Sequence, residues 1–211
     1  MVAPASGVTS DGGPLQIRVD RYGDVFTADW LQAAIAQGKG FAAGAGKQST
    51  HVTFLTYAVN TPDLWVRVPS GITIIPFYGF AALDANTGTA INVVVRTAAN
   101  DIGNGTSSAA DLGPVNLRAD VAAAGSAASQ CVARQLATVA TTAEVAPMEL
   151  DRVNFAVAQG ASSDGYNYRW QPAIRPLLVG PATLELFVSA TTAQSAGYCG
   201  FSWIELPSTL F

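Results

Sequence analysis

Residues 183–190 read TLELFVSA, and this stretch decides the expected fold. Apolar residues alternate in it with polar ones: Leu184, Leu186 and Val188 stand against Thr183, Glu185 and Ser189. A period of two is typical of a β-strand, because successive side chains point to opposite faces of the sheet. The stretch therefore predicts a strand with one face toward a core and one polar face.

The same alternation recurs from residue 51 to the end of the chain. Segments rich in Val, Ile, Thr and aromatic residues are separated by Gly, Pro, Asn and Asp, which favour turns. The expected strands are 51–59, 64–68, 72–83, 89–97, 130–139, 148–158, 166–170, 183–190 and 198–206, with a further candidate at 112–117. Many short strands and almost no helix predict an all-β fold, and among such folds we expect a jelly-roll β-sandwich.

The first 49 residues do not follow this pattern. Residues 1–25 are rich in Gly, Ser, Pro and Asp and predict an extended arm, with a short strand at 15–19. A helix is expected at about 28–37, where Thr27 fits the N-cap and Gly38 the position after the last turn. The Gly/Ala segment 38–46 is expected to be a flexible connector. The predicted organisation is an arm with one short helix, residues 1–49, and a jelly-roll sandwich, residues 50–211.

The chain has few side chains that can take part in catalysis. Only 12% of its 211 residues are charged, against ~25% in typical domains, and His51 is its single histidine. Hydrolase triads need a histidine, and no Cys or His spacing suggests zinc. We therefore predict no enzyme, no cofactor and no metal. One catalytic alternative is a hydrolase that uses Glu149 and Asp151, which lie two residues apart on one predicted strand face.

Charge and hydrophobicity also limit the partners that we expect. The formal net charge is −4, and the 11 Lys and Arg residues form no cluster. Nucleic-acid binding usually shows a basic cluster or stripe, so no direct nucleic-acid contact is expected. No apolar run reaches the ~18 residues of a membrane span, and residues 1–13 do not read as an export signal. Neither a membrane partner nor a signal peptide is therefore expected.

Two cysteines, Cys131 and Cys199, permit one disulfide. Both fall in predicted strands, so a cross-sheet bridge is one alternative. Two buried thiols that behave as small apolar side chains are the favoured alternative.

The segment DGYNYRW, residues 164–170, is the most site-like part of the chain. Tyr166, Tyr168 and Trp170 alternate, so the three rings share one face of an extended segment. They could form an aromatic platform for a glycan, with Asn167, Arg169 and Asp164 as polar contacts. The favoured alternative is that they pack into the core or a subunit interface, where aromatic residues are enriched. Tyr166, Tyr168 and Trp170 are therefore candidate glycan or interface contacts. Tyr198, Phe201 and Trp203 of the last predicted strand have the same two alternatives, with packing favoured there as well.

The organisation of the chain resembles that of virion jelly-roll proteins. A Gly/Pro-rich arm and a short helix precede the strands, and a final strand pair, GPATLELFVSATT at 180–192 and GYCGFSWIELP at 197–207, ends almost at the C-terminus. Over residues 50–207 this pattern is similar to the single jelly rolls that decorate or cement tailed-phage (bacteriophage) heads, and to trimeric tumour-necrosis-factor-like sandwiches. One long region, residues 100–129, departs from a minimal jelly roll and is expected to cap the sandwich or reach a neighbour.

The resemblance implies a non-enzymatic, structural function. We expect a structural protein of the virion: a decoration, cement or minor capsid subunit that forms a homo-oligomer, expected to be a trimer, and contacts capsid or appendage proteins. The arm has no basic cluster, which favours an external position. The alternative is a carbohydrate- or receptor-binding sandwich that uses residues 166–170.

Overall fold

The computed structural model describes residues 6–8, 14–16, 30–54, 60–84, 90–103, 110–118, 128–135, 142–155, 166–190 and 196–210. The chain forms two compact units, Met1–Ala33 and Ala34–Phe211. In the first unit, β1 (Ser6–Val8) pairs antiparallel with β2 (Pro14–Gln16), which overlaps the strand expected at 15–19. The other residues of the expected arm lie outside the described ranges.

Helix α1 (Trp30–Ala36) confirms the single helix expected at about 28–37. The helix ends close to where the sequence predicted, shortly before Gly38. Gly38 has a positive φ of 75° and donates its N–H to the carbonyl of Ile35 at 2.8 Å. A left-handed residue after the last turn satisfies a free carbonyl of the helix, and glycine adopts that conformation without steric cost.

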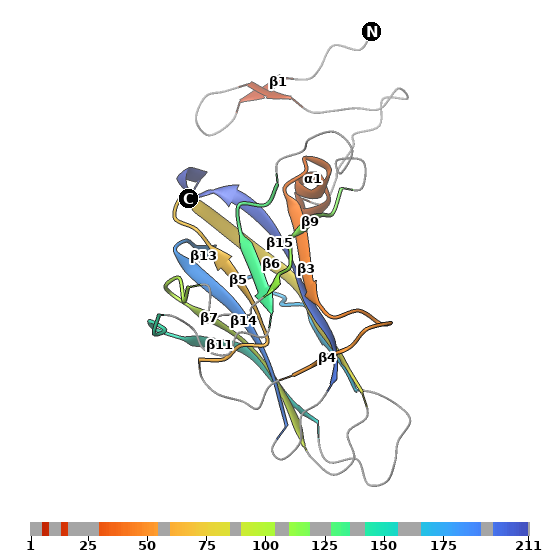
Figure 1. Cartoon of the computed structure of the whole chain (residues 1–211). Coiled ribbons are helices and arrows are strands. Elements are labelled where there is room, and N and C mark those ends of the chain that lie inside the picture. The colour runs from red at the N-terminus through yellow and green to blue at the C-terminus, as the bar shows by residue number, and fades with distance from the viewer. Residues whose placement is uncertain are drawn as a thin grey trace. The chain divides into compact units, whose positions relative to one another are not determined.

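The second unit is a sandwich of two antiparallel sheets (Figure 1). Sheet I has the strand order β12 (Tyr166–Trp170), β6 (Ile72–Leu83), β15 (Ala196–Pro207), β3 (Gly40–Ala45), β9 (Val115–Asn116). Two short strands extend it, because β13 (Leu178–Val179) pairs with β6 and β4 (Val52–Thr53) with β15. A short 3-10 helix, η2 (Ser208–Leu210), follows β15.

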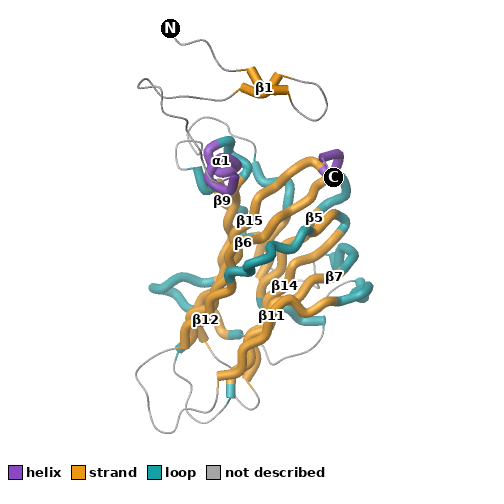
Figure 2. Tube along the Cα trace, turned by 180° about the vertical axis from the view of Figure 1, so that it is seen from behind, coloured by secondary structure: helices purple, strands orange, loops and turns teal. Residues whose placement is uncertain are grey.

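Sheet II has the order β11 (Met148–Phe155), β7 (Ile91–Ala98), β14 (Ala182–Ala190), β5 (Leu64–Val68), β10 (Val132–Gln135), β8 (Ala110–Asp111). Seen from behind, β12, β6 and β15 form one layer and β14, β7 and β11 the other (Figure 2). The predicted all-β sandwich is confirmed, and the strands expected at 64–68, 72–83 and 166–170 have the observed bounds. Parts of those expected at 51–59, 89–97, 130–139 and 148–158 lie outside the described residues.

The connector expected at 38–46 is wrong, because most of it is strand β3. This strand pairs with β15 over six residues, from Gly40 opposite Ile204 to Ala45 opposite Cys199. Its small residues reflect close packing: a Cβ added to Gly44 would lie 3.0 Å from the Cys199 carbonyl oxygen. The composition that suggested flexibility is therefore a requirement of the sheet, and the sandwich begins before the predicted boundary at residue 50.

The core lies between the two sheets. The apolar face predicted for 183–190 points into it, since Leu184, Leu186 and Val188 are buried there with Phe201 and Trp203 of β15. Burial of apolar area at about 25 cal/mol per Å² is the main stabilising term for such a sandwich.

The opposite face of β14 is also buried, although it is polar. Thr183 and Glu185 are 0% exposed, because residues that follow β7 lie against this outer face of sheet II. Ile102 forms a second apolar cluster there with Trp65 and Ala98. The Thr183 hydroxyl donates to the Asn100 carbonyl at 2.8 Å. The start of the region 100–129 therefore caps the sandwich, which was one of its two predicted roles.

The middle of this region joins the edges of the two sheets. In place of the single strand expected at 112–117, β8 pairs with β10 in sheet II and β9 pairs with β3 in sheet I. Leu112, between them, packs against the core. The segment therefore spans one open side of the sandwich.

Candidate functional site

The three aromatic residues of β12 face the interior of the sandwich. Tyr168 is 3% exposed and Trp170 is 5% exposed, and Tyr166 packs half-buried against the same core. Trp170 pairs with Gly79, and a Cβ on Gly79 would lie 3.2 Å from the indole ring. Of the two alternatives for Tyr168 and Trp170, the structure therefore agrees with packing into the core and not with an exposed glycan platform. Alternation identifies the residues that share a face but not whether that face is inside.

The buried phenol of Tyr168 makes a hydrogen bond between the sheets. It donates to Oδ2 of Asp151 on β11 at 2.6 Å. Burial, and then this hydrogen bond to a carboxylate, raise the pKa of Tyr168 above its usual range. The bond joins β12, at one edge of sheet I, to β11, at one edge of sheet II.

Glu149 and Asp151 do not form the carboxylate pair that the sequence suggested. The register of β11 shifts between them: Glu149 lies opposite Arg96, and Asp151 lies opposite the next residue, Val95. Such a bulge reverses the alternation, so the two carboxylates are on opposite faces of the sheet. Glu149 accepts hydrogen bonds from Arg152 at 2.9 and 2.6 Å, which lower its pKa. The arrangement does not match a glycosidase, whose two carboxylates must face one cleft.

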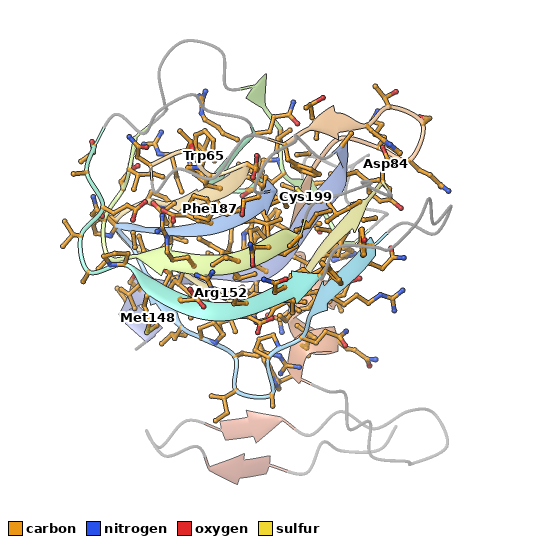
Figure 3. All side chains as sticks on the ribbon, turned by 90° about the horizontal axis from the view of Figure 1, so that it is seen from below. Trp65, Asp84, Met148, Arg152, Phe187 and Cys199 are labelled. Carbon is orange, nitrogen blue, oxygen red and sulfur yellow. The ribbon has the colours of Figure 1, made fainter. Side chains whose placement is uncertain are left out.

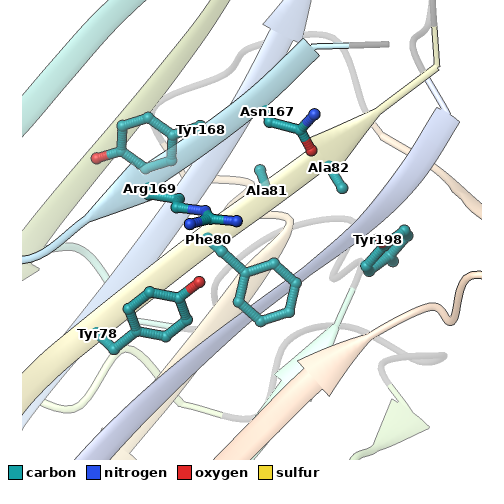
Figure 4. A pocket seen from close by; sticks show the side chains of 8 residues that line it. All are labelled: Tyr78, Phe80, Ala81, Ala82, Asn167, Tyr168, Arg169 and Tyr198. Atoms are coloured by element: carbon teal, nitrogen blue, oxygen red, sulfur yellow. The ribbon is translucent and has the colours of Figure 1, made fainter. Parts of the chain in front are cut away.

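Sheet I carries a different group of aromatic side chains on its outer face. Tyr78 and Phe80 of β6 have ring centroids 5.9 Å apart, and those of Phe80 and Tyr198 are 6.0 Å apart. They border a depression of about 220 Å³ that Asn167 and Arg169 also line (Figure 4). We call Tyr78, Phe80, Tyr198, Asn167 and Arg169 the outer aromatic face. Sequence reasoning missed Tyr78 and Phe80, although Tyr198 was one of the candidate aromatic residues and Asn167 and Arg169 were expected beside an aromatic site. Asp164, the third expected polar contact, lies outside the described residues.

The only histidine lies next to this face. His51 Nδ1 is 2.8 Å from Asp84 Oδ2, and both side chains are substantially exposed. The imidazole ring also lies 5.9 Å from the ring of Tyr198. His51 is therefore a hydrogen-bonded histidine at the surface.

A buried charge cluster lies on the outer side of sheet II. Arg96 donates through Nε to Glu185 at 2.9 Å and through a terminal nitrogen to Glu144, and its Cζ lies 4.4 Å above the Phe187 ring. Burial raises the pKa of Glu185 to about 7, because Arg96 offsets only part of the desolvation and Glu144 repels it. Glu185 Oε1 has no hydrogen-bond partner among the described residues.

Carboxylates with shifted pKa values often lie in catalytic sites, but a catalytic carboxylate must be accessible to a substrate. Glu185 is fully buried, and neither Arg96 nor Glu185 lines the depression on sheet I. The cluster therefore serves to hold Glu144, which lies in the segment before β11, against the sheet.

The two cysteines are separate, buried thiols. Burial raises the pKa of both Cys131 and Cys199 above the usual range, so neither is a reactive thiolate. This agrees with the favoured alternative of two apolar thiols.

An apolar groove of about 240 Å³ lies at another place on the sandwich. Met148, Leu177 and Val179 line it with 46–55% of their surface exposed. Val145, 54% exposed, is close by, since its carbonyl accepts a hydrogen bond from Ala99 in the groove lining. Met148 and Asp84 lie on opposite sides of the molecule in Figure 3. No pattern in the sequence indicates this groove, because loop residues and strand ends meet there.

Among the described residues, no group of three or more His, Cys, Asp or Glu side chains could hold a metal ion. No described helix has the length and apolar character to cross a membrane.

No protein-family model matches the chain, and neither a curated protein nor a solved structure is significantly similar to it. The function must therefore be argued from the surfaces and contacts described above.

Proposed function

We propose that this chain is a non-enzymatic structural subunit of a virus particle, either an external decoration or cement protein or a minor capsid subunit. It acts through contacts with further copies of itself and with capsid or appendage proteins. Direct contact with nucleic acid is not part of the proposal.

The strand order supports a jelly roll. We number the eight main strands along the chain: β3, β5, β6, β7, β11, β12, β14 and β15. Sheet I then has the order sixth, third, eighth, first, and sheet II has the order fifth, fourth, seventh, second. The first strand therefore pairs with the eighth, the second with the seventh, the third with the sixth and the fourth with the fifth. This is the order that results when one long hairpin is rolled into two packed sheets.

The apolar groove is the observation that carries the proposed mode of action. It gathers exposed Met148, Leu177 and Val179 on a chain whose charged fraction is only 12%. Contiguous exposed apolar side chains mark protein–protein contact sites in soluble proteins. Among the described residues, neither the lining of this groove nor that of the depression on sheet I contains a carboxylate. These observations support a protein that acts through contact surfaces rather than through a reactive centre.

A homo-oligomer is the assembly that we propose, with a trimer as the expected form. Closed symmetry allows each copy to bury its groove without leaving an open surface for further growth. The edge strand β11 carries the exposed ion pair Glu149–Arg152, and charges at an edge oppose uncontrolled strand addition. A side-chain interface at the groove is therefore favoured over pairing of strand edges.

Immunogold electron microscopy of virus particles purified from material that contains this gene tests the proposal. Regularly spaced gold on intact particles supports an external structural subunit. Particles without the protein, by labelling and by mass spectrometry of their components, contradict it.

A further inference from the structure

The outer aromatic face has a defined geometry, because a glycine on the neighbouring strand leaves space for one of its rings. Phe80 of β6 lies opposite Gly200 of β15, and a Cβ on Gly200 would be 2.6 Å from Cε1 of the Phe80 ring. The ring therefore lies against the bare backbone of the neighbouring strand. Its plane is 29° from that of Tyr78. A face fixed in this way loses little conformational freedom when a ligand binds.

Polar groups surround these rings. Asn167 and Arg169 are exposed, and Arg169 lies opposite Phe80 in the register of β12 and β6. Figure 4 shows the Arg169 side chain beside the rings of Tyr78 and Phe80. Neither side chain makes a hydrogen bond to another described residue. Amide and guanidinium donors are therefore available next to an apolar floor.

The charge of the lining selects the ligand class. Among the described residues that line the depression, Arg169 is the only charged one, and none is a carboxylate. A second copy docked here about a two-fold axis would bring two arginines to one interface with no acid from this face. A carboxylate on a small ring compound instead matches the planar, bidentate donor pattern of arginine.

From these contacts we propose that the outer aromatic face binds an acidic saccharide. The C–H face of a pyranose ring packs on the ring of Phe80 and its edge against Tyr198, whose ring is inclined by 67° to that of Phe80. The sugar carboxylate pairs with Arg169, and Asn167 hydrogen-bonds a hydroxyl. The depression of about 220 Å³ is a site for one sugar residue, not a long groove. This site is separate from the apolar groove and does not depend on the proposed place in a virion.

Isothermal titration with three probes tests the proposal: 3′-sialyllactose, a hyaluronan tetrasaccharide, and uncharged lactose. The two acids distinguish a sialic acid from a uronic acid, and binding of at least one of them is expected while lactose does not bind. Arg169→Ala and Arg169→Gln should weaken binding about tenfold or more, as expected for loss of a hydrogen bond to a charged group. Tyr198→Ala should weaken it through lost stacking.

Arg152→Ala is the matched control, since it removes an exposed arginine from the other sheet and should leave binding unchanged. Thermal melts of each variant check that the fold is intact. No binding of either acid, equal binding of lactose, or unchanged binding by both Arg169 variants would each overturn the proposal. Light scattering adds one more outcome: if Arg169→Ala lowers the oligomer mass, the face is a subunit interface and the proposal is wrong.

Discussion

The phenol of Tyr168 and the carboxylate of Asp151 meet at 2.6 Å and join the edge strands of the two sheets. Of the two alternatives for Tyr168, an exposed platform and packing into the core, the structure shows the second: its ring is in the core and only its hydroxyl reaches a polar partner. A buried polar tip on an apolar ring needs such a partner. The bulge in β11 provides it, because it turns Asp151 toward the interior.

Tyr168→Phe should destabilise the protein by about 1–3 kcal/mol, because it leaves Asp151 without its buried donor. The free energy of unfolding in urea measures this. Tyr166→Phe is the control on the same strand, since the Tyr166 hydroxyl is buried with no partner among the described residues. That change should be neutral or slightly stabilising. Equal decreases in the free energy of unfolding of the two variants would show that the Tyr168–Asp151 hydrogen bond does not stabilise the fold.

Stability should depend on pH through Glu185. Its pKa is about 7 in the folded chain against 4.5 for an ordinary glutamate, so the folded state binds more protons between these values. The free energy of unfolding should therefore fall as pH rises from about 4.5 through 7, by on the order of 3 kcal/mol at most. Glu144, whose pKa burial also raises, adds to the same slope.

Glu185→Gln should flatten this dependence and raise stability at pH 8 relative to the wild type. Urea midpoints at pH 5, 6, 7 and 8 measure it. Glu149→Gln is the control, because Glu149 is exposed and its pKa is lowered, so it titrates below this range. If the wild type and Glu185→Gln keep the same slope from pH 5 to 8, the buried carboxylate is not the source.

Glu205 holds the segment before β10 onto β15. Its carboxylate accepts from the Trp203 indole at 2.9 Å, from the Gln130 backbone N–H at 2.9 Å, and from the Ser129 hydroxyl. Glu205→Ala should cost about 3 kcal/mol or more, because three donors lose their acceptor in a buried site. Glu205→Gln keeps one acceptor oxygen and should cost less. Hydrogen exchange of residues 128–135 should rise in the alanine variant, and unchanged protection there would refute this role.

The sequence was sufficient for most of the long strands and for the faces that residues share where no bulge intervenes. Alternation in 183–190 predicted the buried face of β14, and Tyr166, Tyr168 and Trp170 do share a face. Alternation cannot tell which face is inside, because that depends on the other sheet. It also failed at two local features: the bulge that separates Glu149 from Asp151, and the glycines of β3, which pack closely although they resemble a connector.

The remaining surfaces depend on tertiary contacts. The outer aromatic face joins residues of β6, β12 and β15, and the position of its Phe80 ring depends on Gly200 beneath it. The apolar groove joins β11, β13 and the loop before β13. The polar face of β14 is buried only because Ile102 and its neighbours cover it. None of these could be inferred before the chain was folded.

The molar mass of the purified chain by light scattering tests the central claim, that this molecule works through contacts between copies at the apolar groove. The wild type should have the mass of an oligomer, with three copies expected. Val179→Glu should lower it toward the monomer, while Val115→Glu, the same change at an exposed valine of another two-residue strand, should not. A wild type that stays monomeric at all concentrations, or an oligomer that Val179→Glu leaves intact, would contradict the claim.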